Sequence, residues 1–252
     1  MFGDEFLEVL DEAATVRMVA HLDAMLARAR AGEPLQYVLG HWPFRQLDLM
    51  VDRRVLIPRP ETEEVVGVAL ALLDRSRQLR CADLGCGSGA IGLSLAGELP
   101  RGRSEVWCTD VSTDALNVAR ANAAGLGLAA SAVRFAEGSW WAALPSELAG
   151  TFDIVVSNPP YVAVGDPQLE HGVAAHEPAL ALFAGEDGLD AVRALLADAP
   201  RWLMPGGWLV VEIGASQGEA VRQLAAHVPG LTDVDVRPDA AGRDRVLLAR
   251  RR

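Results

Sequence analysis

The sequence predicts an α/β fold in which a mainly parallel sheet carries helices on both faces. Three observations support this prediction. Short apolar strands alternate with helices of about ten residues or more from residue 81 onward. A glycine-rich turn joins the first of these strands to its helix. The chain has 252 residues, half of them hydrophobic, so it is long enough to bury a sizeable core.

The N-terminal part of the chain shows three different patterns. Residues 4–30 carry apolar side chains at helical spacing and predict one helix or two short ones. Residues 37–57 are broken by Gly40 and Pro43 and are rich in β-forming residues, which predicts a strand pair or an extended linker. Residues 62–73 return to helical spacing. We therefore expect a small helical segment at 1–34, a β-hairpin linker at 35–58 and the main domain at 59–252.

The main domain then alternates between strands and helices. Strands are expected at 81–85, 105–110, 132–135, 152–158 and 207–213, and helices at 90–99, 113–126, 189–203 and 218–228. Two closing strands, near 232–236 and 245–249, have no helix between them, so one of them is expected to run antiparallel. Residues 162–188 predict a long loop beside a strand end, and loops of that length usually serve a function.

Composition excludes several classes of function. Lys and Arg number 23 against 34 Asp and Glu, which gives a net charge of −11. This balance argues against direct binding of nucleic acid through its phosphates, which needs a concentrated basic surface. The three cysteines, Cys81, Cys86 and Cys108, lack paired metal-ligand spacing and predict free thiols without a metal site. No secretory signal pattern or bilayer-spanning apolar run is present, so we expect a cytoplasmic protein that does not contact membranes.

The glycine-rich turn predicts a ligand site. Four glycines fall within eight residues, and together with a preceding acid they are Asp83, Gly85, Gly87, Gly89 and Gly92. Glycines let the backbone approach a ligand closely, and the following helix N-terminus offers free N–H groups. Asp110 ends the next strand, where a carboxylate would bind ribose hydroxyls of either a dinucleotide or an adenosyl-sulfonium cofactor. Asp83 would repel a pyrophosphate but could hold an ammonium or face a sulfonium; it could instead stabilise the turn.

A second motif, Asn158-Pro159-Pro160-Tyr161, follows the strand at 152–158. Two prolines have nearly fixed φ, so they hold the Asn158 side chain and the Pro159 carbonyl in a rigid arc. The two oxygens can accept hydrogen bonds from a planar NH₂ group, and Tyr161 offers a ring for stacking. Such bonds favour a localised nitrogen lone pair aimed at an electrophilic methyl group. A plain proline turn is the alternative.

These motifs resemble those of a known family. Asp-Leu-Gly-Cys-Gly-Ser-Gly upstream of Asn-Pro-Pro-Tyr resembles S-adenosylmethionine-dependent methyltransferases of amino groups. Within that group the chain is similar to the HemK/PrmC family of peptide chain release factor glutamine methyltransferases. The segments that carry this resemblance are GEPLQYVLGHWPF (32–44), VLIPRPETEEVV (55–66), HEPALALFAGEDGLD (176–190), EIGASQG (212–218) and DAAGRDRV (239–246). The resemblance implies a Rossmann-like, seven-stranded class I methyltransferase sheet.

The resemblance also implies roles for individual residues. The residues that would line the methionine part of S-adenosylmethionine are Gly85, Cys86, Gly87, Ser88 and Gly89. Asp110 would bind the ribose, and Trp140 would lie against the adenine, with Ser139 in place of the family's frequent Asp; Trp140 and Trp141 could instead belong to the core. Asn158 to Tyr161 would hold the substrate glutamine. Arg59, Glu61 and Glu63 would shape the cofactor mouth and substrate pocket, or form interdomain ion pairs, while His176, Glu177, Arg243 and Arg245 would anchor loops.

The function implied is methyl transfer to the glutamine amide of the Gly-Gly-Gln motif in class I release factors. The family's helical N-terminal domain is longer than the roughly thirty residues that precede GEPLQY here. We therefore expect a change in affinity for the protein substrate and an intact methyl-transfer site. Two alternatives remain: an adenine amino-methyltransferase of DNA or RNA, disfavoured by the negative charge, and a dinucleotide-binding or catalytically silent protein.

Overall fold

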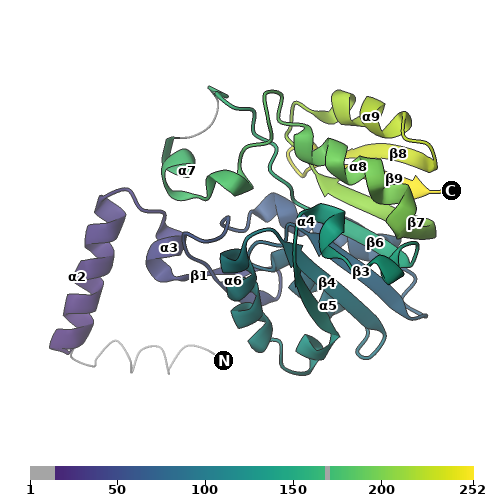
Figure 1. Ribbon diagram of the computed structural model, residues 1–252. Coiled ribbons are helices and arrows are strands. Elements are labelled where there is room, and N and C mark those ends of the chain that lie inside the picture. The colour runs from purple at the N-terminus through teal and green to yellow at the C-terminus, as the bar shows by residue number, and fades with distance from the viewer. Residues whose placement is uncertain (1–14, 168–170) are drawn as a thin grey trace.

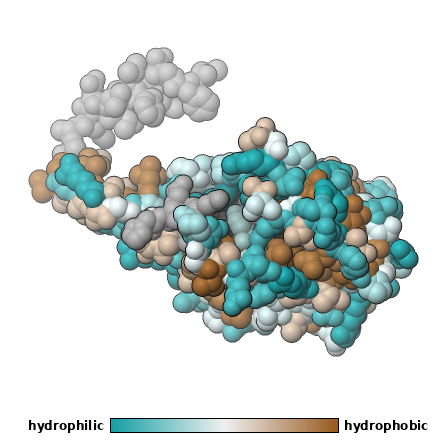
Figure 2. All heavy atoms as spheres, turned by 90° about the horizontal axis from the view of Figure 1, so that it is seen from above, coloured by the Kyte–Doolittle hydropathy of each residue, from teal (hydrophilic) through white to brown (hydrophobic). Residues whose placement is uncertain are grey.

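The computed structural model describes residues 15–167 and 171–252. Its first element, α2 (Val16–Arg30), projects from the rest of the described chain (Figure 1). The hydroxyl of Thr15 caps this helix by accepting a hydrogen bond from the Met18 amide at 3.2 Å. No residue of α2 is buried, and the projecting end carries exposed apolar side chains among polar ones (Figure 2). The helix predicted over 4–30 is confirmed from residue 16; its first part lies outside the described residues.

The linker forms a helical turn and a hairpin. Helix α3 (Leu35–Leu39) precedes the antiparallel strands β1 (His41–Phe44) and β2 (Leu47–Met50), so the predicted strand pair is confirmed while α3 is an element that the sequence pattern did not predict. Asn122 fastens the hairpin to the main domain, because its side chain accepts from the Met50 amide at 2.7 Å and donates to the Met50 carbonyl at 3.1 Å.

Seven strands form the central sheet in the order β5-β4-β3-β6-β7-β9-β8. They are β3 (Leu79–Leu84), β4 (Ser104–Asp110), β5 (Val133–Glu137), β6 (Phe152–Ser157), β7 (Leu203–Glu212), β8 (Leu231–Pro238) and β9 (Asp244–Arg251). All pairs are parallel except those made by β9, which runs antiparallel to both neighbours. The predicted antiparallel closing strand is therefore the last one.

Helices cover both faces of this sheet, as predicted (Figure 1). On one face lie α4 (Pro60–Leu72), α5 (Ala90–Glu98) and α6 (Thr113–Ala124); on the other lie α8 (Asp190–Trp202) and α9 (Gly218–Ala226). The 3₁₀ turns are η1 (Gly127–Ala132), η2 (Trp140–Ala143), η3 (Ser146–Leu148) and η4 (Ala179–Ala181).

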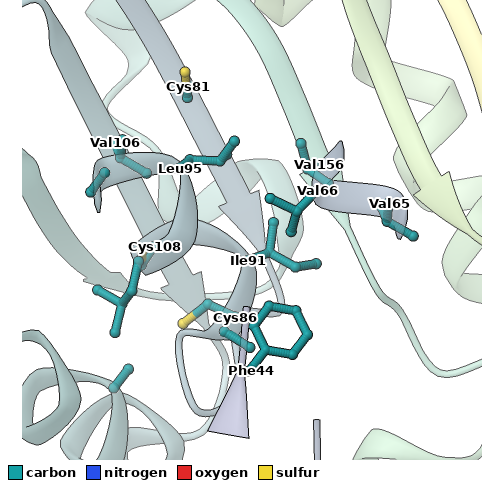
Figure 3. Packing of buried hydrophobic residues seen from close by; sticks show 14 of the residues in the cluster. Phe44, Val65, Val66, Cys81, Cys86, Ile91, Leu95, Val106, Cys108 and Val156 are labelled. Atoms are coloured by element: carbon teal, nitrogen blue, oxygen red, sulfur yellow. The ribbon is translucent and has the colours of Figure 1, made fainter. Parts of the chain in front are cut away.

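Strand periodicity divides the core into two apolar clusters. In β6, Ile154 and Val156 join the cluster beneath α4, α5 and α6, while Val155 joins the cluster beneath α8 and α9. Figure 3 shows the first cluster, in which Ile91 of α5 packs near Phe44 of the hairpin and Val156 of the sheet. Both faces of the central strands are thus buried, which fixes the positions of the strand ends.

Strand order places a crevice at the middle of the sheet. From β3 the chain builds outward through β4 to β5 and then returns to β6 on the other side of β3. The connections that follow β3 and β6 leave in opposite directions from the carboxyl edge, and ligands of open α/β sheets bind at such a switch point. Residues 162–188 lie beside this edge. They are not a plain loop, since they contain α7 (His171–His176), η4 and a parallel bridge between Val162 and Phe183.

Candidate active site

A cleft with a cavity volume of about 460 Å³ lies where β3, β4 and β6 end. The sequence-predicted residues that line it are Gly85, Cys86, Gly87, Ser88, Asp110, Ser139, Trp140, Asn158 and Pro160. The other residues predicted to contact cofactor or substrate, which do not line it, are Arg59, Glu61, Glu63, Asp83, Gly89, Pro159 and Tyr161. Most of the predicted cofactor residues are therefore gathered around one cavity.

The glycine turn brings backbone N–H groups to the cleft. Gly85, Gly87 and Gly89 all have positive φ, at 76°, 54° and 85°. A Cβ atom on Gly85 would come within 3.3 Å of the Trp140 ring, so this position needs glycine for close packing as well as for its backbone conformation. The amides of Gly85 and Cys86 both donate to the Thr109 carbonyl at 2.8 Å, which ties the turn to β4.

Asp110 is held by the turn that it faces. One carboxylate oxygen accepts a hydrogen bond from the Gly87 amide at 2.9 Å, and the other accepts from the Ser112 amide at 2.9 Å. Burial raises the pKa of Asp110, and these backbone hydrogen bonds oppose that rise. Each carboxylate oxygen has a second acceptor direction, so the group is oriented and can still accept hydroxyl donors from the cleft.

Asp83 lies beneath the turn. It is fully buried, and one carboxylate oxygen accepts from the Gly92 amide at 2.8 Å. The other oxygen is buried without a hydrogen-bond partner among the described residues. Burial raises the pKa of Asp83 to about 7. Because Asp83 bonds the first turn of α5, the alternative of a turn-stabilising residue accounts for one of its oxygens, and the unpartnered oxygen remains available for a donor.

The two neighbouring tryptophans have different environments. Trp140 has a positive φ of 47° and lines the cleft. Trp141 is buried, stacks on Trp202 with ring centroids 6.1 Å apart, and donates through Nε1 to the Ala194 carbonyl at 3.2 Å. Trp141 is thus part of the core, and Trp140 is the tryptophan that could contact a ligand.

Asn158 lines the cleft at the end of β6, and one polar atom of its side chain has no hydrogen-bond partner among the described residues. Its side-chain nitrogen donates to the Thr62 hydroxyl at 3.1 Å, and that hydroxyl donates to Glu212 at 2.6 Å. The Asn158 side-chain oxygen is buried and has no partner among the described residues. An unpaired buried acceptor is costly, so its presence in a cleft indicates a ligand that supplies a donor.

Comparison with known proteins identifies the family. A family model described as "Methyltransferase small domain" matches residues 67–176. The "Release factor glutamine methyltransferase" of Xylella fastidiosa (strain 9a5c) is 48% identical over 227 residues, which cover 90% of this chain and 80% of that protein. The protein of the same name from Moorella thermoacetica is also 48% identical, over 97% of this chain and 83% of that protein. The chain belongs to this family.

Solved structures of methyltransferases have the same fold as this chain. A crystal structure of a methyltransferase from Pyrococcus furiosus has a TM-score of 0.58 at 18% identity and covers 94% of this chain and 98% of that one. The N-terminal domain of human METTL16 in complex with SAH has a TM-score of 0.57 at 19% identity and covers 81% and 75%. These likenesses confirm the predicted class I methyltransferase fold of this release factor glutamine methyltransferase family member.

The PRPETE segment of this family member forms ion pairs with distant parts of the chain. Arg59 pairs with Glu177, whose other oxygen accepts from the Ile57 amide at 3.2 Å. Glu61 lies 3.4 Å from Arg243, and Glu63 accepts from the Arg45 amide at 3.0 Å. The contacts of Arg59 and Glu61 agree with the alternative of ion pairing between segments, whereas Glu63 is bonded to a backbone amide and forms no ion pair among the described residues. A direct cofactor or substrate contact by Arg59, Glu61 or Glu63 stays a prediction.

Tyr161 is positioned by its main chain. Its carbonyl accepts from Gln217 at 3.0 Å, and burial raises the pKa of its hydroxyl to about 12. Gly188 packs closely against this segment, because a Cβ there would clash with the Tyr161 carbonyl. Stacking by the Tyr161 ring stays a prediction.

Several residues that line the cleft or contact a lining residue were not predicted from the sequence. Thr62 and Arg54 line the cleft, as do Leu180 and Phe183 from the segment at 162–188. Thr62 had a detectable signal, because it is a polar residue on the same helical face as the apolar residues of α4. Glu212 had one too, as an acid at the end of an apolar strand. Within the described residues, no group of three or more His, Cys, Asp or Glu side chains could hold a metal, and no helix is long and apolar enough to cross a membrane.

Proposed function

We propose that this enzyme transfers a methyl group from S-adenosylmethionine to the side-chain amide nitrogen of the glutamine in the Gly-Gly-Gln motif of class I release factors. Family membership supports the reaction. The structural observation that carries the proposal is the unpartnered Asn158 oxygen in the cleft. An amide NH₂ group would supply the donor that this oxygen lacks.

The cleft fits the cofactor. S-adenosylmethionine supplies an electrophilic methyl group on a sulfonium. The turn at Gly85 to Gly89 offers the close backbone approach that the methionine part requires, Asp110 offers oriented acceptors for ribose hydroxyls, and Trp140 offers a ring for the adenine. Asp83 lies beneath the turn and does not line the cleft, so we further propose that its unpartnered oxygen accepts from the methionine ammonium through water.

The Asn-Pro-Pro-Tyr motif would orient the nucleophile. A glutamine amide is a weak nucleophile because its lone pair is delocalised. The Asn158 oxygen and the Pro159 carbonyl would each accept one N–H, which favours a lone pair localised on nitrogen and directed at the methyl group. No strong base is needed among the residues of the cleft, because the proton can leave after the methyl group has bonded to nitrogen.

The partner, the location and the domain division belong to the same proposal. Class I release factors would be the protein substrates, bound in the cytoplasm, where translation terminates, without direct contact to nucleic acid. We also propose that the chain divides at 34/35 and 58/59 into a helical segment, a hairpin linker and the methyltransferase domain. The hydrogen bonds between the hairpin and Asn122 support close association of the last two.

Incubation of the purified enzyme with a class I release factor and methyl-labelled S-adenosylmethionine tests the proposal. We expect one methyl group per release factor, located by mass spectrometry on the glutamine of the Gly-Gly-Gln peptide. A release factor in which that glutamine is replaced by alanine is the control. Label that persists in this control, or that appears on adenine when DNA or RNA is offered instead, would refute the assignment.

A further inference from the structure

Three polar side chains that lie far apart in the sequence form a hydrogen-bonded chain from the cleft into the protein interior. Asn158 follows β6, Thr62 lies in the first turn of α4, and Glu212 ends β7. Thr62 is 3% exposed and Glu212 is 1% exposed. The sequence places these residues up to 150 positions apart, and the fold joins them by hydrogen bonds of 3.1 and 2.6 Å.

The direction of these hydrogen bonds fixes the orientation of the Asn158 amide. A threonine hydroxyl has one proton, and an ionised carboxylate can only accept. The Thr62 hydroxyl therefore donates its hydrogen bond to Glu212 and accepts one from the Asn158 nitrogen. The bond from one N–H to Thr62 fixes which side of the amide carries the nitrogen, so the Asn158 oxygen lies on the other side and is the acceptor left for the substrate.

We infer that Thr62 and Glu212 are positioning residues that keep the Asn158 oxygen, and not its NH₂ group, directed at the substrate nitrogen. This inference rests on the proposed function, since it assigns an acceptor role to Asn158. Neither residue needs to touch the reacting atoms. Their effect is on the orientation of one amide group.

Protonation of Glu212 would reverse the direction of the hydrogen bonds that link Glu212, Thr62 and Asn158. A neutral carboxylic acid can donate to Thr62, which can then turn its proton toward the Asn158 oxygen. The amide would rotate and present NH₂ to the substrate's own NH₂, which cannot accept. Methyl transfer therefore requires the ionised form of Glu212.

The surroundings of Glu212 bring the pKa of its carboxyl group close to neutral pH. Burial raises the pKa of Glu212 to about 7, Glu61 adds to the rise, and Thr62, Arg245 and Arg59 oppose it. Two of these groups have other partners: Arg59 pairs with Glu177, and Arg245 donates to the Ile213 carbonyl at 3.0 Å. Tyr161 faces Glu212 as well and stays neutral, since its own pKa is raised to about 12.

Substitution of Thr62 is the first test, with the release factor as substrate. Thr62→Val keeps the shape and removes the hydroxyl, so we expect kcat to fall by about 10²-fold, as for a misplaced reacting group, with the Kd of S-adenosylmethionine unchanged. Thr62→Ser keeps the hydroxyl and should retain most of the activity. Thr151→Val is the matched control, because it removes a hydroxyl bonded to the Leu148 carbonyl at the opposite end of β6. Equal kcat values for Thr62→Val and wild type would overturn the inference.

Substitution of Glu212 tests the protonation step. In the wild type we expect kcat to rise with pH with a midpoint near 7. Glu212→Gln can still accept from Thr62 but does not titrate, so this rise should disappear while folding, checked by circular dichroism, is retained. A pH profile that is the same in both proteins would contradict the role of Glu212.

A measurement without substrate separates this inference from the proposed function. The side-chain ¹⁵N–¹H₂ signal of Asn158, assigned by its absence from Asn158→Ala, should shift with pH around 7 in the wild type. It should not shift in Glu212→Gln or Thr62→Val. A shift that persists in both variants, or that is absent from the wild type, would refute the hydrogen-bonded chain. Failure of release factor methylation with the expected shift intact would refute only the proposed function.

Discussion

At the scale of single residues, Asn158 and Asp110 face the same cleft with different expected effects. Asn158→Ala removes an acceptor that acts most strongly as the nitrogen lone pair forms. We expect kcat to fall by about 10²-fold, the loss typical of one electrostatic stabilising group, while the Kd of S-adenosylmethionine changes little. Steady-state kinetics and calorimetry measure the two quantities. Asn117→Ala, at an exposed position of α6, is the control; an unchanged kcat in Asn158→Ala would exclude Asn158 from the chemistry.

Asp110→Ala should weaken the binding of S-adenosylmethionine more than it lowers kcat. Its carboxylate is oriented by the amides of Gly87 and Ser112, and its remaining acceptor directions suit the ribose hydroxyls. A hydrogen bond to a charged group is worth about 1.5–3 kcal/mol, so we expect the Kd of S-adenosylmethionine to rise at least about tenfold. Calorimetric titration measures this, with Asp114→Ala in the same region as control. A Kd equal to that of the wild type would show that Asp110 does not bind the cofactor.

At the scale of elements, Gly92 sets the distance between α5 and the sheet. A Cβ there would lie against the Cys108 sulfur and 3.2 Å from the Asp83 Cβ, and Cys108 and Asp83 belong to β4 and β3. Gly92→Ala should therefore lower the free energy of unfolding by about 1–3 kcal/mol, although alanine is the better helix former. Urea unfolding measures this value.

Gly97 provides the matched control in the same helix. A Cβ at Gly97 meets no atom within 4 Å, so Gly97→Ala should raise the free energy of unfolding by about 0.5–1 kcal/mol. Opposite signs for the two alanine variants would show that packing, and not helix propensity, requires glycine at 92. A stabilised Gly92→Ala variant would contradict the close packing of α5 on β3 and β4.

Sequence patterns predicted the elements whose periodicity reflects burial. The strands and helices around the glycine turn are of this kind, because alternation and helical spacing record which faces meet the core. Helix α3 was missed because five residues between Pro34 and Gly40 are too few to show a period. Helix α7 and the 3₁₀ turn η4, within residues 162–188, were missed for the same reason: both are short, and neither has a long apolar face.

Spatial relations within the site were harder to predict than its motifs. The glycine turn and Asn158 could be found because their residue types have few other uses at a strand end. The Thr62 contact could not, since 96 positions separate it from Asn158 and only the folded sheet brings them together. Trp140 and Trp141 are adjacent and alike, and only the packing on Trp202 shows which of them belongs to the core.

At the scale of the whole molecule, two buried acids lie at the centre of the fold. Asp83 is fully buried and Glu212 is 1% exposed, and burial raises the pKa of each to about 7. In the unfolded chain the same groups have pKa values near 3.8 and 4.5. Between these values and about pH 7, the folded protein therefore binds protons that the unfolded chain has released.

This difference gives stability a negative slope with pH. Because the folded state binds more protons, the free energy of unfolding contributed by Asp83 and Glu212 is fully present below about pH 4 and is lost as pH rises to about 7. Urea unfolding between pH 5 and pH 8 should show this fall in the wild type. The double variant Asp83→Asn, Glu212→Gln keeps the acceptors for Gly92 and Thr62 without the titration, so its slope should be smaller. Asp233→Asn, at a half-exposed position with its carboxylate 3.6 Å from Arg250, is the control. Equal slopes in the wild type and the double variant would mean that these two acids are ionised in the folded protein throughout this range. That result would also contradict the protonation of Glu212 near neutral pH.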